Sequence, residues 1–306
     1  MSEEIALVCP NCHEPIRPAD TFCEGCGHQL IQAIVPNTED HDEIDRGTAA
    51  GVTDRGLHHR RNEDALHMAV VGSMVALVVC DGVSTCASPH LAAGAAAGTA
   101  GELLAEALQE RQRTPERAWD PVAATAAAMA RAQAAVLLVP WPQRSGLEAP
   151  SCTFVSALWD GETIAVGWAG DSRAYWIGAA AYLQLTTDDS WAQEQRDAGT
   201  GGAALDVGDA RAHSITRWLG ADAPEQPPQT ASFSPMEPGR LVVCTDGLWD
   251  YLPTTSALVE QVHSLPAEAA PIDVARALVR YAIVAGGHDN VTVAVADLTP
   301  GSRGRL

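Results

Sequence analysis

The stretch from Leu241 to Asp250 reads LVVCTDGLWD and is the part of the chain from which the fold can best be inferred. Its apolar start, Leu241 to Val243, predicts a buried strand, because short apolar runs bounded by turn residues usually form one. Asp246-Gly247 follows, so we expect a carboxylate where a rigid strand gives way to a loop. The segment therefore predicts an acidic side chain at the edge of a sheet.

Three further apolar runs are joined to an aspartate in the same way. They are Val75 to Val79 before Asp81-Gly82, Ile164 to Trp168 before Gly170-Asp171-Ser172-Arg173, and Val291 to Val295 after Asp289-Asn290. A single Asp-Gly pair also marks a hairpin turn. Four such aspartates at strand ends indicate one site, and hard cations such as magnesium and manganese are bound by a few carboxylates plus water.

The ordered motifs resemble the metal-dependent type-2C serine/threonine protein phosphatases of bacteria. The similarity extends from about Thr48 to Leu298 and implies an α+β fold, a four-layer α-β-β-α sandwich of two mainly antiparallel sheets with metals at one edge. The motifs that carry the resemblance are Asn62-Glu63-Asp64-Ala65, Asp81-Gly82, Gly170-Asp171-Ser172-Arg173, Leu185-Thr186-Thr187-Asp188, Asp246-Gly247-Leu248-Trp249-Asp250 and Asp289-Asn290-Val291-Thr292.

The resemblance also implies a set of ligands for two or three manganese or magnesium ions. Asp81 is expected to bridge two ions, Asp246 and Asp289 to complete the first one, and these three are the expected catalytic carboxylates. Asp171 matches the residue that holds a third ion in bacterial members. The full expected set is Glu63, Asp64, Asp81, the backbone carbonyl of Gly82, Asp171, Asp246, Asp250 and Asp289.

Three positions depart from the family pattern. His59 stands where the family has an Arg that binds the substrate phosphate, so Arg60 or Arg61 is expected to bind phosphate beside His59. Arg can bind phosphate through two bonds, whereas His can do so only when protonated; exposed basic residues on a loop are the alternative interpretation. Val83 and Asp189 stand where the family often has His, which leaves the general acid open between a metal-bound water and His59.

The expected function is hydrolysis of phosphoserine and phosphothreonine in proteins by in-line attack of a metal-bridging hydroxide. By the same resemblance, the enzyme is expected to oppose a serine/threonine kinase. The alternative is a catalytically weak pseudophosphatase that acts as a phosphoprotein-binding or regulatory module. The missing imidazoles and the displaced Arg favour that alternative, and the retained carboxylates oppose it.

The amino-acid composition narrows the classes of protein that have to be considered. The 306 residues carry a net charge of −20, and all nineteen basic residues are Arg, so binding to a nucleic acid or a nuclease activity is not expected. No apolar run reaches the eighteen or so residues of a membrane span, and the acidic N-terminus does not resemble a signal peptide. A cytoplasmic protein without membrane or nucleic-acid partners is therefore expected.

The first thirty residues contain two Cys-x-x-Cys pairs, Cys9 with Cys12 and Cys23 with Cys26. Four thiolates at this spacing suit one structural zinc ion, and a segment so short cannot fold on an apolar core alone. Two disulfides or a redox pair are the alternatives. We expect a zinc ribbon over 1–30 that contacts another protein, an acidic linker over 31–47, the phosphatase domain over 48–298 and a disordered tail over 299–306.

Local patterns predict the scaffold around the site. Ala-rich helices are expected over 88–110 and 121–138, and amphipathic helices over 254–264 and 273–285. Segments 152–160 and 163–177 are expected to form a hairpin closed at Asp160-Gly161, and the first strand is expected within 51–57. By the family resemblance, the Gly-rich segment between Trp191 and His213 is expected to be the flap beside the metals, and a loop of this length is often functional.

Overall fold

The computed structural model of the chain describes Cys12, Gly25, Cys26 and residues 40–142, 146–199, 214–224 and 227–301. The chain divides into two units, Met1–Glu39 and Asp40–Leu306. In the first unit Cys12 and Cys26 are exposed, whereas Cys9 and Cys23 lie outside the described residues. Most of the expected flap and the end of the expected tail lie outside them as well. The fold below is that of the second unit.

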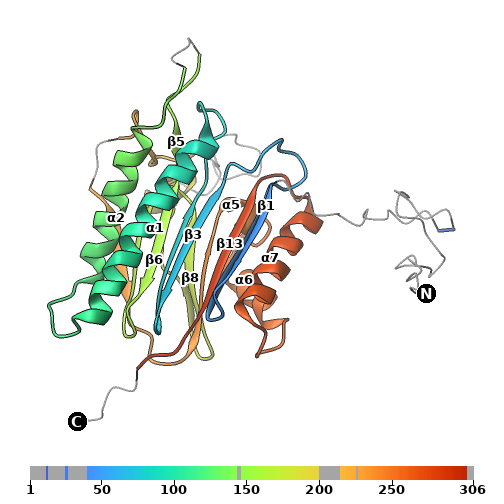
Figure 1. Cartoon of the computed structure of the whole chain (residues 1–306). Helices are drawn as coiled ribbons and strands as arrows, with labels where there is room; N and C mark the ends of the chain where they lie inside the picture. Colours follow the sequence, from blue (N-terminus) through green and yellow to red (C-terminus); the bar gives the residue numbers. More distant parts are fainter. Residues whose placement is uncertain are drawn as a thin grey trace, which may run out of the picture. The chain divides into compact units, whose positions relative to one another are not determined.

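Two antiparallel sheets form the centre of this unit (Figure 1). The six-stranded sheet has the order β1 (His41–Asp45), β2 (Ala49–Asp54), β13 (Val291–Leu298), β12 (Gly239–Cys244), β8 (Arg173–Gly178), β9 (Tyr182–Gln184). The five-stranded sheet has the order β11 (Gln229–Phe233), β7 (Ile164–Ala169), β6 (Phe154–Trp159), β4 (Met74–Cys80), β3 (Ala65–Val71). A short ladder joins β5 (Ser151–Cys152) to β10 (Leu219–Gly220).

Helices cover the outer face of each sheet. Helices α1 (Pro89–Arg113) and α2 (Pro121–Val136) pack on the five-stranded sheet, while α7 (Pro271–Ala285) packs on β2 and β13 of the other sheet (Figure 1). The shorter helices are α3 (Trp191–Asp197), α5 (Asp246–Trp249) and α6 (Thr255–His263). The four-layer α-β-β-α sandwich expected from the sequence is therefore confirmed.

Strand β4 shows why the central runs are apolar at every position. Side chains alternate between the two faces of a strand, and β4 is buried on both. Val75, Leu77 and Val79 pack in the core between the sheets, whereas Val78 and Cys80 belong to the core under α1 and α2. A strand with a core on each face has no solvent-facing row, so its sequence shows no polar alternation.

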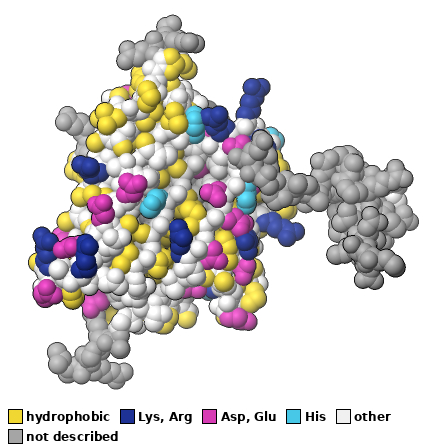
Figure 2. Space-filling model, viewed as in Figure 1, with side chains coloured by type: hydrophobic (Ala, Val, Ile, Leu, Met, Phe, Trp, Pro, Cys, Tyr) yellow, Lys and Arg dark blue, Asp and Glu magenta, His cyan; other side chains and the backbone are white. Residues whose placement is uncertain are grey.

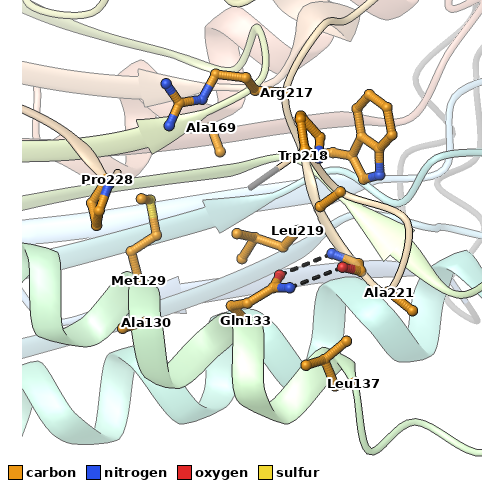
Figure 3. A pocket seen from close by; sticks show the side chains of 13 residues that line it. Met129, Ala130, Gln133, Leu137, Ala169, Arg217, Trp218, Leu219, Ala221 and Pro228 are labelled. Carbon is orange, nitrogen blue, oxygen red and sulfur yellow. Dashed lines mark hydrogen bonds between the residues drawn. The ribbon is translucent and has the colours of Figure 1, made fainter. Parts of the chain in front are cut away.

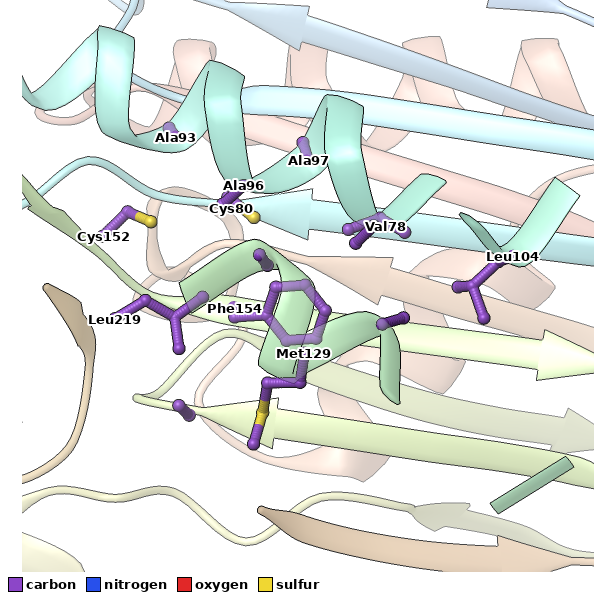
Figure 4. Close-up of a cluster of buried hydrophobic side chains, with 14 of the residues drawn as sticks. Val78, Cys80, Ala93, Ala96, Ala97, Leu104, Met129, Cys152, Phe154 and Leu219 are labelled. Atoms are coloured by element: carbon purple, nitrogen blue, oxygen red, sulfur yellow. The ribbon is translucent and has the colours of Figure 1, made fainter. Parts of the chain in front are cut away.

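The Ala-rich sequence of α1 fits its place against the sheet. Ala93, Ala96 and Ala97 point toward Val78 and Cys80, and all five side chains are buried (Figure 4). The small alanine side chains allow the helix to lie close to the strands, so this face of α1 is buried without large side chains between helix and sheet. The helix begins with Pro89 in its first turn, where the missing N–H is tolerated.

One prediction from the sequence is wrong at the edge of the six-stranded sheet. Residues 41–45, inside the expected linker 31–47, form strand β1 and pair with β2. Ile44 packs on the core between the sheets, while Glu43 forms an ion pair with Arg276 at 2.6 Å. The acidic side chains alternate with the packed one, as charged residues do on exposed edge strands.

Two other expectations about local structure are also corrected. The segment expected as one strand over 163–177 is divided between β7 and β8, which belong to different sheets, and residues 170–172 cross between the sheets. Gly170 has a φ of +103° at this crossing, a conformation that favours glycine. Asp246 does not lie in a loop, because it begins the short helix α5.

Candidate active site

Four aspartates lie at the ends of adjacent strands. In the five-stranded sheet, Asp64 precedes β3 and Asp81 follows β4, and these two strands are antiparallel neighbours. In the six-stranded sheet, Asp246 follows β12 and Asp289 precedes β13, which are also antiparallel neighbours. Antiparallel neighbours bring the end of one strand beside the start of the next. Each sheet therefore contributes one adjacent pair of carboxylates.

Burial and mutual repulsion raise the pKa values of three of these aspartates. Burial, with Asp246 and Asp289 adding repulsion, raises the pKa of Asp64 to about 8. Burial and the charge of Asp289 raise the pKa of Asp246 to about 7. Burial and the neighbouring carboxylates also hold the pKa of Asp81 well above its usual range. Like charges this close disfavour ionisation unless a cation compensates them.

Unpartnered oxygens show where such a cation is needed. Asp64 accepts hydrogen bonds at Oδ2 from the hydroxyls of Thr292 at 2.6 Å and Thr245 at 3.0 Å. Its Oδ1 and the Oδ1 of Asp246 are buried and have no hydrogen-bond partner within the described part of the chain. Buried acceptors without a partner are costly, and carboxylate oxygens are what magnesium and manganese prefer. The residues therefore fit a hard divalent cation.

The cluster is not closed into a finished coordination sphere. Across the described ranges, no group of three or more His, Cys, Asp or Glu side chains is arranged so that it holds an ion by itself. The site is recognised by burial, charge and unpartnered oxygens.

Asp171 joins this cluster from the crossing between the sheets. Burial and the charge of Asp246 raise the pKa of Asp171 well above its usual range. Its backbone carbonyl accepts a 2.9 Å hydrogen bond from the indole of Trp249 in α5, and the guanidinium of Arg173 lies 3.7 Å from the centre of that ring. These contacts fix the crossing segment against the helical turn that starts with Asp246.

Arg173 also forms a buried ion pair. Its Nε and Nη2 donate to the two carboxylate oxygens of Asp188 at 2.9 and 2.6 Å. Burial by itself lowers the pKa of Arg173, but the bonds to Asp188 outweigh it and raise that pKa. Asp188 and Arg173 are thus structural charges that neutralise each other.

Gly82 is required by close backbone packing beside Asp81. A Cβ at this position would lie 2.6 Å from the carbonyl carbon of Pro89 and 2.8 Å from the carbonyl oxygen of Glu63. The N–H of Gly82 donates to that same Glu63 oxygen at 3.2 Å. Gly82 therefore joins the start of α1 to the segment that carries Glu63 and Asp64.

Asn290 organises the loop that precedes β3, a role that the sequence analysis did not assign. Its side-chain amide donates to the carbonyls of Arg55 at 2.8 Å and Arg61 at 3.1 Å, and its Oδ1 accepts from the N–H of Glu63 at 2.7 Å. The asparagine lies directly after Asp289 in the sequence. The loop is therefore held beside the carboxylate cluster through one buried amide.

The expected phosphate-binding residues lie on this loop but differ in their contacts. His59 Nε2 lies 3.2 Å from Oδ1 of Asp289. Arg60 is exposed, and its backbone carbonyl accepts a hydrogen bond from Arg55. Its side chain has no hydrogen bond or ion pair within the described residues. Arg61 is exposed too, but its Nη1 donates to Nε2 of His90 at 2.6 Å. His90 is the second residue of α1 and was not singled out from the sequence.

The remaining acidic residues singled out from the sequence differ in their exposure and hydrogen bonds. Glu63 is partly buried and accepts a 2.8 Å hydrogen bond from the hydroxyl of Ser84. Asp250 is exposed and contributes to the raised pKa of Asp246. Asp189, at the position of a family imidazole, accepts from the N–H of Gly170 at 3.1 Å. The carboxylate of Asp189 thus supports the crossing segment.

A pocket of about 400 Å³ adjoins this region on the side of α2 (Figure 3). Met129 and Leu137 of α2 line it together with Arg217 and Trp218. Gln133 exchanges two 2.9 Å hydrogen bonds with the backbone of Gly220, which fixes β10 against the helix. The pocket includes Ala169, next to the crossing segment, but none of the clustered aspartates lines it.

Comparison with known proteins agrees with this geometry. The chain matches the family described as Protein phosphatase 2C over residues 55–280, and residues 8–30 match a zinc-ribbon domain. Because the first match covers most of the chain, the protein belongs to the protein phosphatase 2C family. The serine/threonine protein phosphatase PstP of Mycobacterium tuberculosis is 28% identical over 253 residues, which is 81% of this chain and 44% of PstP. The chain thus spans less than half the length of the curated relatives that it matches.

Solved structures support the same assignment. The M. tuberculosis PstP/Ppp structure is 26% identical, with a TM-score of 0.62, and the match covers 82% of this chain and 98% of that one. The catalytic domain of PstP in complex with two manganese ions is 27% identical, with a TM-score of 0.58 and coverage of 81% and 96%. The phosphatase MsPP of Mycobacterium smegmatis, in complex with cacodylate, is 26% identical, with a TM-score of 0.59 and coverage of 82% and 97%.

Proposed function

We propose that the chain is a metal-dependent protein serine/threonine phosphatase that hydrolyses phosphoserine and phosphothreonine. The observation that carries this proposal is the cluster of buried aspartates with unpartnered oxygens at the strand ends of a protein phosphatase 2C fold. Phosphate monoesters are anions, and a site of buried carboxylates attracts them only when cations are bound. Metal binding is therefore part of the proposed function.

Manganese or magnesium ions are proposed at this cluster, two of them by analogy with PstP. Asp81, Asp246 and Asp289 are the proposed ligands that matter most for catalysis, with Glu63, Asp64, the Gly82 carbonyl, Asp171 and Asp250 completing the proposed set. Bound divalent ions lower the pKa of a water molecule and polarise phosphoryl oxygens.

The chain's own residues have separate proposed tasks. The aspartates hold and orient the ions, and Thr245 and Thr292 keep Asp64 oriented through their hydroxyls. The exposed basic residues of the 59–61 loop bind the substrate phosphate. Asn290 holds that loop in place, so its proposed effect on catalysis is indirect.

The N-terminal unit is proposed to bind one structural zinc ion through Cys9, Cys12, Cys23 and Cys26, as the match to a zinc-ribbon domain supports. The ribbon is proposed to contact another protein, and the phosphatase to act on phosphorylated proteins that a serine/threonine kinase produces. A cytoplasmic location stays a prediction. No helix in the described ranges is both long enough and apolar enough to cross a membrane.

The activity is tested by manganese-dependent hydrolysis of a phosphoserine peptide. Asp246→Asn keeps the size of the side chain but removes its charge, so kcat/KM is expected to fall on the order of 10²–10³-fold. Asp297→Asn is the matched control, because Asp297 lies at the opposite end of the same sheet and forms an exposed ion pair with Arg240.

The test separates the enzyme from the alternative. Hydrolysis that needs manganese and is lost in Asp246→Asn supports the phosphatase. A wild-type protein that binds manganese but hydrolyses no phosphopeptide contradicts it and favours the regulatory module. In the first case the control variant must retain the wild-type activity, since its substitution is remote from the aspartate cluster.

A further inference from the structure

Arg61 contacts two elements that lie beside the aspartate cluster. Its carbonyl is held by Asn290, the residue after Asp289, at 3.1 Å. Its guanidinium extends to His90 at the start of α1, and the neighbouring Pro89 carbonyl packs against Gly82, the residue after Asp81. The side chain is therefore anchored near Asp289 at one end and near Asp81 at the other.

The partner of Arg61 is neutral, and this distinguishes Arg61 from Arg173, whose guanidinium is buried in an ion pair. Arg173 is bonded to the carboxylate of Asp188, which cancels its charge. Arg61 donates to an imidazole nitrogen, which accepts only when it carries no proton. Burial and the charge of Arg61 lower the pKa of His90, while Glu63 opposes them.

A guanidinium held in this way stays available to an anion. It has five N–H donors, and the bond to His90 uses one of them. The remaining donors include the planar pair that fits two phosphate oxygens, and the full positive charge is retained. Both Arg61 and His90 are partly or fully accessible to solvent, so a phosphate can reach them.

We propose that Arg61 binds the substrate phosphate and that His90 is the positioning residue that holds its guanidinium, in place of the family Arg whose position His59 occupies. This inference rests on the proposed function, since it names the groups that bind the phosphate at the same site. It also distinguishes Arg61 from Arg60, whose side chain forms no hydrogen bond or ion pair within the described residues.

Figure 1 shows α1 crossing the five-stranded sheet, with its N-terminal end beside the loops that connect the strands. The face of the molecule in Figure 2 intermixes basic, acidic and apolar side chains and has no broad basic surface. Recognition of phosphate is therefore expected to depend on individual basic groups such as Arg61.

Binding of inorganic phosphate to the full-length, manganese-saturated protein tests the inference by calorimetry, independently of turnover. Arg61→Gln is expected to weaken phosphate binding about 10–100-fold, because hydrogen bonds to charged groups contribute about 1.5–3 kcal/mol. His90→Ala is expected to weaken it about 3–10-fold, since the donor remains but is no longer oriented. His90→Gln, which keeps an acceptor, is expected to recover part of that loss.

Coupling between the two residues is the decisive readout. In the double variant Arg61→Gln/His90→Ala, phosphate affinity is expected to match that of Arg61→Gln alone, because His90 acts only through Arg61. In kinetics, both single variants are expected to raise KM for a phosphate ester more than they lower kcat. Arg113→Gln and His263→Ala, both exposed and remote, are the matched controls.

The outcomes separate this inference from the proposed activity. If the wild type hydrolyses phosphopeptides but Arg61→Gln binds phosphate as the wild type does, the inference is wrong and the phosphatase stands. Fully additive losses in the double variant, or a larger loss in Arg60→Gln than in Arg61→Gln, also overturn it. If the wild type binds phosphate through Arg61 but hydrolyses nothing, the inference stands and the activity is wrong.

Discussion

Two groups of buried acidic side chains lie close to each other in this fold, and they differ in whether a basic side chain neutralises their charge. Asp188 receives two hydrogen bonds from Arg173, whose guanidinium also packs on Trp249. Asp64 and Asp246 have no ion pair with Arg or His within the described ranges, and each leaves one buried oxygen without a partner. One group is neutralised by the chain itself, and the other is not.

The difference separates structural charges from functional ones. A buried ion pair is compensated before any ligand binds, because each partner supplies the charge opposite to the other. Buried carboxylates without compensation have raised pKa values and make the folded state less stable at neutral pH. Such a cluster is maintained at a cost in stability at neutral pH that a bound cation relieves.

Breaking the compensated pair has the largest expected effect on stability. Arg173→Leu leaves the carboxylate of Asp188 buried without a cation and removes the contact with Trp249, so the free energy of unfolding is expected to fall by about 3–5 kcal/mol. Urea denaturation followed by tryptophan fluorescence measures this loss. All eight tryptophans lie between Trp119 and Trp249, so the signal reports on the second unit alone.

The second variant Arg173→Leu/Asp188→Leu sharpens that result. Removing the stranded carboxylate as well is expected to recover a large part of the lost stability, because no buried charge then remains unpaired. A loss below about 1 kcal/mol in Arg173→Leu, a value typical of exposed ion pairs, would show that the pair is not neutralised in the way described.

The uncompensated cluster is expected to make stability depend on pH when metal is absent. The folded pKa values of Asp64, about 8, and Asp246, about 7, lie above the unfolded value of 3.8. Between about pH 4 and pH 8 the folded chain therefore binds more protons than the unfolded chain, and stability falls as pH rises. The metal-free protein is expected to melt several degrees lower at pH 8 than at pH 6.

Manganese and a neutral variant provide the controls for this pH dependence. Saturating manganese binds the ionised carboxylates, so it is expected to remove or reverse the fall in melting temperature. Asp64→Asn removes one of the titrating groups and is expected to reduce the slope in metal-free protein. An equal pH slope in the wild type and this variant would contradict the assigned pKa of Asp64.

The smallest expected effect concerns the hydroxyl groups that orient Asp64. Thr292→Val removes the 2.6 Å hydrogen bond to Asp64 Oδ2 with little change in volume. Manganese affinity is expected to fall about 10-fold, as for other groups that orient metal ligands. Titration calorimetry measures this change, and Thr163→Val, on the β6–β7 hairpin, is the matched control. Unchanged affinity in Thr292→Val would show that the hydroxyl does not orient the ligand.

The sequence predicted the strands that carry the site because their signal is local. The apolar runs of β4, β7, β12 and β13 are buried on both faces, so every residue in them contributes to the pattern. Strand β1 was missed because HDEID gains its apolar contact from one residue, Ile44, and pairs on one side only, with the next strand β2. An edge strand rich in charged residues has the same composition as a solvated linker, so the two cannot be distinguished from the sequence.

The site was predicted in part for the same reason. The aspartates adjoin strong strand signals, and the motif that begins with Asp289-Asn290 already contained the asparagine that holds the loop. The contact between Arg61 and His90 joins residues 29 positions apart. Nothing local in the sequence distinguishes Arg61 from Arg60, so the choice between them follows only from the packing of α1 against Gly82.

Calorimetric titration of manganese into zinc-saturated, full-length protein at pH 7 tests the central claim most directly, namely that the uncompensated aspartates are cation ligands. The wild type is expected to bind manganese with release of protons, since Asp64 and Asp246 are partly protonated at this pH. Binding is expected to weaken at least about 10-fold in Asp246→Asn and to be unchanged in Asp297→Asn. Equal affinity in Asp246→Asn and the wild type, or no manganese binding at all, would contradict the account.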